Sequence, residues 1–374
     1  MLTEIFKHSS DDLIQRGLHR KRAVINVQSP GGINFSSNDY LSLSSHPLIK
    51  KAYQEGFERY SCGSGGSMVV CGYHSSHEAL ERAFAEALGV DDCLVFPSGY
   101  AANLSIMGLL ARFNTHVLID KAVHASIYDG LTLSGAQYSR YLHNNLSHVA
   151  QKLESAPLNT AMVTEGTFSM SGQCAPLGDL VDMAKNHGHT VLVDEAHSFG
   201  LLGREGLGAV AHYQLTQEDV PLRMIAFGKA CASFGAIVAG RAEWIDALLQ
   251  SARAHIYSTA ISPAVAHGLL KTLDIVRHSD ERRRKLTGLV HYFRESIKAS
   301  PLRWSDSSSP IQQLQLGCPE RALLMAERLQ EHAIVCLPMR EPTVSRVETG
   351  LRVILNHDHE QEDIDRLFQC LDLA

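Results

Sequence analysis

The stretch from Thr190 to Lys229 is the part of the sequence that most constrains the fold. It opens with an apolar run of the kind that a buried parallel strand needs, and this run ends at Asp194, three residues before His197. A second apolar run leads to Lys229. Open α/β sheets place their ligands at the carboxyl ends of strands. This spacing therefore predicts a carboxylate, an imidazole and an amine at one edge of a sheet.

Each of these three side chains has an ordinary structural explanation when it is taken alone. Asp194 could cap a helix, His197 could be a hydrogen-bonded core residue, and Lys229 could be a solvated turn residue. Together they suit pyridoxal phosphate (PLP), which needs a lysine for a Schiff base and an anion that keeps its ring nitrogen protonated. An imidazole is suited to pack on the ring or to bond its phenolic oxygen. The combination predicts a PLP site.

Strand-like apolar runs alternate with helical patterns along most of the chain, which predicts βαβ units and a mainly parallel sheet. One run is followed by Ser98, Gly99 and Tyr100 at the start of a helical pattern, where N–H groups and the helix dipole suit a phosphate. We also expect Ser75 and Glu78 to form a capping box at the start of a helix.

Length and composition limit the class of protein. A chain of 374 residues is long enough for one large domain and a smaller one, and we expect an N-terminal arm at 1–45, a large domain at 46–275 and a small domain at 276–374. The net charge of −6 favours neither nucleic acid nor a membrane as partner. Eight cysteines without a Cys-x-x-Cys pair predict reduced thiols in a cytoplasm and no metal site.

With these motifs in this order, the chain resembles the α-oxoamine synthases, PLP-dependent enzymes of fold type I, from about residue 10 to its end. The motifs that carry the resemblance lie at 34–41, 63–67, 72–73, 164–170, 194–197, 227–229 and 342–344. The Ser-Ser-Asn and Gly-Ser-Gly-Gly-Ser forms favour the branch that makes 8-amino-7-oxononanoate for biotin synthesis. The resemblance implies an α/β fold: a large domain with a mainly parallel seven-stranded sheet flanked by helices, a smaller α/β C-terminal domain and a short N-terminal arm.

The resemblance also implies a role for each matching side chain near the cofactor. Lys229 would hold PLP as a Schiff base and move protons at the substrate's α-carbon. Asp194 would pair with the pyridine N–H, His197 would bond the phenolic oxygen, and His124 would stack on the ring. The remaining cofactor-binding residues would be Ser98, Gly99, Tyr100, Ser169 and Thr259.

Substrate and partner expectations follow from the same resemblance. Asn38 and Arg352 would bind the carboxylate of the amino acid, which suits the planar fork of an arginine. Thr343 and Arg20 would also contact substrate, with Arg20 on the far carboxylate of the acyl chain. Thr259 would reach the phosphate from the partner subunit of a homodimer with a shared active site.

The implied reaction is the decarboxylative condensation of L-alanine with pimeloyl-CoA or a pimeloyl carrier protein. One alternative is another α-oxoamine synthase that joins a different amino acid to a different acyl-CoA. A second alternative is a nucleotide-binding protein of Rossmann type, which needs a glycine-rich turn directly between strand and helix. The sequence also departs from the family pattern at Ala226, where a threonine usually bonds the phosphate.

Overall fold

The computed structural model describes residues 2–22, 24 and 32–372, which form two compact units. The large unit comprises residues 39–169 and 174–283. The small unit comprises residues 1–38, 170–173 and 284–374. The expected bounds at 45/46 and 275/276 stay predictions. None of the helices in the described part of the chain is long and apolar enough to cross a membrane.

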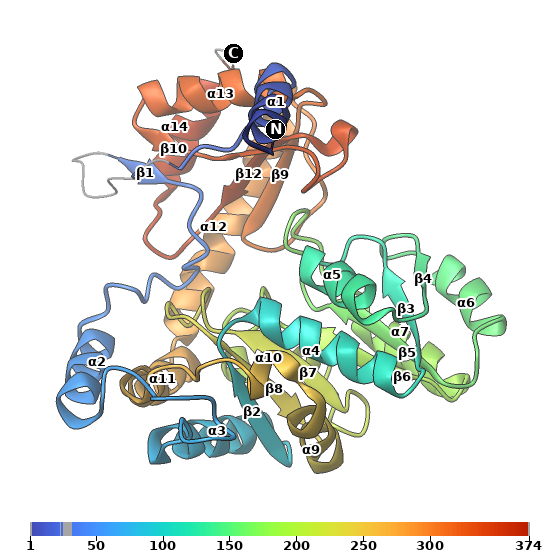
Figure 1. The fold of residues 1–374 in the computed structure, drawn as a ribbon. Helices are drawn as coiled ribbons and strands as arrows, with labels where there is room; N and C mark the ends of the chain where they lie inside the picture. The colour runs from blue at the N-terminus through green and yellow to red at the C-terminus, as the bar shows by residue number, and fades with distance from the viewer. Residues whose placement is uncertain (1, 23, 25–31, 373–374) are drawn as a thin grey trace. The chain divides into compact units, whose positions relative to one another are not determined.

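A seven-stranded sheet is the centre of the large unit (Figure 1). Its strands, in spatial order, are β2 (Asp92–Phe96), β8 (Ala236–Gly240), β7 (Leu222–Ala226), β6 (Thr190–Asp194), β5 (Thr160–Glu165), β3 (His116–Asp120) and β4 (Tyr138–Tyr141). The strands from β7 to β4 pair in parallel, whereas β8 is antiparallel to both β7 and β2. This mainly parallel sheet confirms the predicted fold class.

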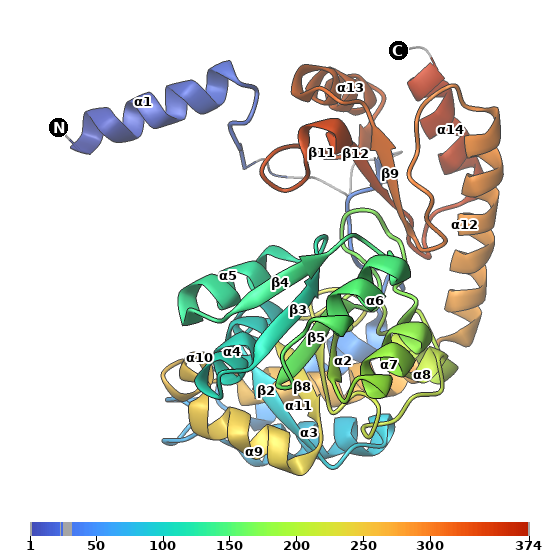
Figure 2. The same cartoon turned by 90° about the vertical axis from the view of Figure 1, so that its right-hand side faces the viewer.

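Helices cover the sheet, as the βαβ pattern predicts. They are α2 (Pro47–Arg59), α3 (Ser75–Leu88), α4 (Gly99–Arg112), α5 (Ala125–Ser134), α6 (Leu146–Glu154), α7 (Leu177–Asn186), α8 (Ala209–His212), α9 (Ala242–Ser251), α10 (Arg253–Ile256) and α11 (Pro263–Arg277). The crossovers through α4 and α5 run toward β4, and those through α6 and α7 return from it. Right-handed crossovers of opposite direction occupy opposite faces. Figure 2 accordingly shows α4 and α7 on different sides of the sheet.

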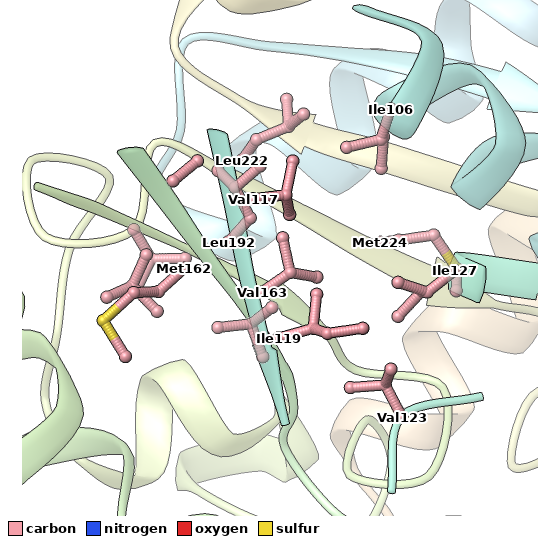
Figure 3. Packing of buried hydrophobic residues seen from close by; sticks show 14 of the residues in the cluster. Ile106, Val117, Ile119, Val123, Ile127, Met162, Val163, Leu192, Leu222 and Met224 are labelled. Atoms are coloured by element: carbon pink, nitrogen blue, oxygen red, sulfur yellow. The ribbon is translucent and has the colours of Figure 1, made fainter. Parts of the chain in front are cut away.

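The core of the large unit lies between the sheet and its helices (Figure 3). Its buried members include Ile106 of α4, Ile119 of β3, Val163 of β5 and Met224 of β7. Strands that are buried on both faces read as continuous apolar runs. The polar residues that end these strands are therefore confined to the sheet edge.

The small unit contains a three-stranded antiparallel sheet in the order β11-β12-β9 and a short parallel pair, β1-β10. Its strands and helices are α1 (Leu2–Gln15), β1 (Ile33–Asn34), β9 (Ile311–Gln315), α13 (Pro319–Glu331), β10 (Ile334–Val335), β11 (Pro338–Met339), β12 (Gly350–Ile354) and α14 (Gln361–Asp372). The long helix α12 (Asp280–Ala299) begins in the large unit and continues into the small one.

The start of α3 differs from the prediction. The helix begins at Ser75, and the residue before it, His74, is the N-cap. The backbone N–H of His74 donates to Nδ1 of His77, 3.1 Å away, so the reciprocal pair is His74 and His77. The expected capping box of Ser75 and Glu78 is wrong, because both residues already lie inside the helix.

Candidate active site

The predicted cofactor residues follow the carboxyl ends of strands in the large unit. Ser98 follows β2, His124 follows β3, and Lys229 follows β7. Asp194 is the last residue of β6, and Glu165 is the last residue of β5. These strands run in the same direction, because two antiparallel pairings separate β2 from β7. Their ends therefore meet at one sheet edge, where open α/β sheets bind ligands.

Asp194 is the buried anion of this edge, with 5% of its surface exposed. Its Oδ1 accepts the backbone N–H of Ala196 at 2.8 Å, and its Oδ2 accepts Nδ2 of Asn103 at 2.8 Å. The arrangement therefore presents a buried, oriented carboxylate of the kind that a protonated pyridine nitrogen requires.

Two histidines lie at the same edge with defined partners. His124 is the N-cap of α5, and its Nδ1 accepts the backbone N–H of Ser126. Burial lowers the pKa of His124, Asp194 raises it, and the charge of Lys229 lowers it further. His197 is buried, and its Nδ1 lies 2.6 Å from the hydroxyl of Tyr40. The ring of each histidine is therefore held in place by a contact at Nδ1.

Ser98, Gly99 and Tyr100 form the start of α4. The Oγ of Ser98 accepts the backbone N–H of Ala101 at 3.1 Å, which makes Ser98 the N-cap. The first N–H groups of an α-helix have no partner within the helix and carry the positive end of its dipole, so this turn suits a phosphate. The hydroxyl of Tyr100 donates to Asp129.

Close packing explains the glycine at 99. A Cβ on Gly99 would lie 3.3 Å from the Cβ of Ala226 and 3.3 Å from the side chain of Met224. The end of β7 therefore packs directly against the predicted phosphate turn. Ala226, which lacks the hydroxyl of the family pattern, lies beside the turn where a phosphate would bind.

Glu165 belongs to this edge, although the sequence analysis assigned it no role. It is 2% exposed and is the register partner of Asp194 on the neighbouring strand. Its Oε2 accepts the backbone N–H of Ser169 at 3.2 Å. Burial and the charge of Asp194 raise the pKa of Glu165 well above its ordinary value, although Lys229 acts in the opposite direction. Glu165 therefore keeps its proton to a higher pH than an ordinary glutamate does. The sequence feature that could have indicated this residue is its place as an acidic residue at the end of an otherwise apolar strand.

Thr259 lies on an exposed loop between α10 and α11. The next residue, Ala260, donates its N–H to the carbonyl of Gly66 at 2.9 Å and accepts the hydroxyl of Ser64 at 3.0 Å. The loop is thus joined to the glycine-rich segment 63–67. A Cβ at Gly72 would collide with the carbonyl of Gly66, so this segment uses its glycine for the close approach of two backbones.

The four predicted substrate residues lie in the small unit, where they form two pairs. Nη2 of Arg352 donates to Oδ1 of Asn38 at 3.1 Å, and Nη2 of Arg20 lies 3.5 Å from Oγ1 of Thr343. Three of them line a cavity of about 200 Å³ together with Arg340. Its full lining is Leu18, Arg20, Ser36, Met170, Leu337, Pro338, Met339, Arg340, Glu341, Thr343, Arg352 and Ile354. An apolar chain with a terminal anion matches this lining.

The donor set fits PLP rather than a metal. The large unit supplies an amine, a buried carboxylate and a helix N-terminus, which match the aldehyde, the pyridine nitrogen and the phosphate of the cofactor. Among the residues that the structure describes, no cluster of three or more histidine, cysteine or acidic side chains could hold a metal ion.

Comparisons with known proteins agree with this geometry. The family model described as "Aminotransferase class I and II" matches residues 30–371. An 8-amino-7-oxononanoate synthase of Pseudomonas putida (strain GB-1) is 39% identical over 364 residues, which are 95% of this chain and 93% of the relative. One from Stutzerimonas stutzeri (strain A1501) is 41% identical, with 95% and 92% covered.

Two solved structures of similar proteins agree with these sequence comparisons. The 8-amino-7-oxononanoate synthase of Francisella tularensis has a TM-score of 0.82 at 30% identity and covers 92% of this chain and 98% of its own. Serine palmitoyltransferase of S. paucimobilis has a TM-score of 0.90 at 25% identity, with 98% and 96% covered. The chain therefore belongs to the aminotransferase class I and II family, and within it lies among relatives named 8-amino-7-oxononanoate synthase.

Proposed function

We propose that this protein is an acyltransferase that condenses L-alanine with a pimeloyl thioester and releases CO2, to give 8-amino-7-oxononanoate in biotin biosynthesis. The supporting observation is that Asp194, His124 and Lys229 meet at one sheet edge in a chain that is 39% identical to such a synthase over 95% of its length. The predicted dependence on PLP is confirmed by the family and by solved relatives with PLP bound.

The reaction makes one carbon–carbon bond and breaks a carbon–hydrogen, a carbon–sulfur and a carbon–carbon bond. The α-carbon of alanine gives up its proton and bonds the acyl carbonyl carbon as the carbon–sulfur bond breaks, and the thiol leaves with a proton. The bond from the α-carbon to the alanine carboxylate then breaks to release CO2, and a proton returns to that carbon. PLP supplies the electron sink that makes the α-carbon of the amino acid acidic.

The residues of the large unit bind the cofactor and move the proton. Lys229 would hold the aldehyde carbon of PLP, and its amine would carry a proton from and to the α-carbon of the amino acid. Asp194, oriented by its two hydrogen bonds, would pair with the pyridine nitrogen. His197, held by Tyr40, would bond the phenolic oxygen, and the first turn of α4 would bind the phosphate with help from Ser169.

In the small unit, two basic pairs suit the two anionic ends of the reactants. Arg352, held by Asn38, binds the carboxylate of alanine. Arg20, near Thr343, binds the far carboxylate of the acyl chain, and apolar side chains such as Leu18 and Ile354 contact its methylenes. Charge-assisted bonds of this kind select a dicarboxylic acyl chain over a neutral one.

We also propose a cytoplasmic homodimer in which Thr259 reaches the phosphate of the partner subunit. In support, Thr259 is exposed beside the glycine-rich segment, and large apolar side chains on the two joined segments are exposed, with Val70 at 78% and Tyr257 at 72%. Contiguous exposed apolar residues often mark interfaces. Sedimentation of the wild type and of a Val70→Asp variant tests the dimer, and a monomeric wild type would reject it.

The deciding experiment is a product assay with the PLP-loaded protein. L-alanine, glycine and L-serine are each combined with pimeloyl-CoA, with a pimeloyl carrier protein and with palmitoyl-CoA, and the products are identified by mass. We expect CO2 and 8-amino-7-oxononanoate from L-alanine with a pimeloyl thioester. Turnover only with a long neutral acyl-CoA, or only with serine, would assign the chain to another branch of the α-oxoamine synthases.

A further inference from the structure

A chain of buried hydrogen bonds starts at Asn103 in α4. This side chain is 4% exposed, and its Nδ2 donates to two acceptors, Oδ2 of Asp194 at 2.8 Å and Oγ of Ser126 at 2.9 Å. A primary amide nitrogen has two hydrogens, so both are used. An ionised carboxylate can only accept, and the atom of Asn103 that faces Asp194 is therefore its NH2 group.

The chain continues from Ser126 to His124. Oγ of Ser126 already accepts from Asn103, so its own hydrogen is left to donate, and Nδ1 of His124 lies 2.9 Å away. The backbone N–H of Ser126 points to the same Nδ1 at 3.3 Å. A backbone N–H can only donate, so Nδ1 is an acceptor. The imidazole of His124 therefore carries its hydrogen on Nε2.

We propose that Asn103 and Ser126 are positioning residues that hold Asp194 and His124 as one unit. Asn103 fixes the orientation of the carboxylate that serves the pyridine nitrogen, and Ser126 fixes the tautomer of the imidazole that faces the same cofactor. This assignment rests on the proposed PLP chemistry. Asn103 and Ser126 would not contact the cofactor themselves. They would affect its binding through Asp194 and His124.

The charges around His124 agree with a neutral ring. The groups that act on it are Asp194, Lys229 and Asp129, and burial is the largest influence on its pKa, in the downward direction. Two donors on Nδ1 favour the neutral ring further, because an N–H at that position would face them. A fixed Nε2–H donor on His124 and the orientation of Asp194 are thus maintained by one connected network, and such networks are worth more than their separate bonds.

The test compares S126A and N103L with S105A. Ser105 is a matched control, because it is a buried serine on α4 whose hydroxyl bonds only a backbone carbonyl, that of Ala101 at 2.9 Å. Nitrogen NMR of histidine-labelled protein, with the His124 signal identified by its loss in H124Q, reports the tautomer and the pKa with and without PLP. PLP affinity is measured by fluorescence.

We expect S126A to raise the pKa of His124, because one of the two donors to Nδ1 is lost, with S105A unchanged. The backbone N–H of residue 126 remains in S126A and should keep the proton on Nε2. N103L should weaken PLP binding about tenfold, the cost of a lost bond to a buried charge. The double variant N103L/S126A should lose less than the product of the two single losses, because the residues act as a unit. If N103L does not fold, N103A replaces it.

Three results would overturn the proposal. The first is a proton on Nδ1 of His124 in the wild type. The second is an S126A variant whose His124 signal equals that of S105A. The third is a loss of PLP affinity in N103L/S126A that equals the product of the two single losses. A failure of the proposed function can be told apart from these results. If the tautomer of His124 is fixed but the protein does not condense alanine with a pimeloyl thioester, the network stands and the proposed reaction is rejected.

Discussion

The hydroxyl of Tyr40 lies 2.6 Å from Nδ1 of His197, and both side chains are buried. These residues are 157 positions apart in the chain. The contact with Tyr40 fixes the orientation of the His197 ring. Second partners of this kind determine which imidazole nitrogen serves a cofactor.

Removal of this hydroxyl should weaken cofactor binding. We expect Y40F to raise the Kd for PLP about fivefold, because one buried hydrogen bond contributes about 1 kcal/mol. Fluorescence titration of the apoprotein with PLP measures this Kd. Y128F is the control, since the hydroxyl of Tyr128 donates to the backbone carbonyl of Lys121 at 2.8 Å. Equal affinities of Y40F and Y128F would show that Tyr40 does not support His197.

Ala226 offers a gain of function at the phosphate turn. It packs beside Gly99, where a threonine hydroxyl would lie next to the predicted phosphate. We expect A226T to lower the Kd for PLP about fivefold through one added hydrogen bond. A226V has the same shape without the hydroxyl and should not improve binding. An identical affinity for A226T and A226V would mean that no phosphate bond forms at this position.

Glu165 should make stability depend on pH in a defined direction. Its pKa in the folded protein is raised above the unfolded value, so its contribution to stability is complete below the unfolded pKa and is lost as the pH rises toward the folded pKa. E165Q has no titrating group at this position. The free energy of unfolding of E165Q relative to wild type should therefore rise with pH, by at most about 1.4 kcal/mol per unit.

Urea unfolding of both proteins from about pH 5 to about pH 8 measures this difference. The control is E154Q, because Glu154 is an exposed residue at the end of α6. A difference between E165Q and wild type that stays flat with pH, as expected for E154Q, would contradict a raised pKa of Glu165.

Arg20 should determine acyl-chain preference. We expect R20Q to lower kcat/KM for pimeloyl-CoA about tenfold or more, because a charge-assisted bond to the far carboxylate is lost, and to leave heptanoyl-CoA nearly unchanged. R22Q is the control, since Arg22 is exposed on the same segment and is absent from the cavity lining. A loss of kcat/KM of the same size with both acyl chains would show that Arg20 does not bind the far carboxylate.

Much of the large unit could be predicted from the sequence. The strands before Asp194 and Lys229 were recognisable because a strand buried on both faces reads as an apolar run. The strand β4 was not recognised from the residue pattern. Its sequence is Tyr-Ser-Arg-Tyr, and it is the outermost strand of the sheet, where polar residues are tolerated. The strand β11 is only two residues long and carries no periodicity.

The supporting side chains of the site could not be found in this way. Asn103 and Ser126 lie on two different helices, and each resembles an ordinary helical polar residue until its partners are known. Tyr40 lies in a loop 157 residues from its histidine. Local patterns record backbone preference and burial, and they contain no information on which distant side chains meet.

The sequence by itself therefore determined the class of the fold, the strand ends that carry the chemistry and the cofactor, because periodic burial and short motifs are local properties. Only the tertiary structure decided that Glu165 lies beside Asp194 with a raised pKa, and that Asn103 and Ser126 connect Asp194 to His124. The physical reason is that charge state and tautomer depend on burial and on hydrogen-bond partners, which arise only when distant segments pack together.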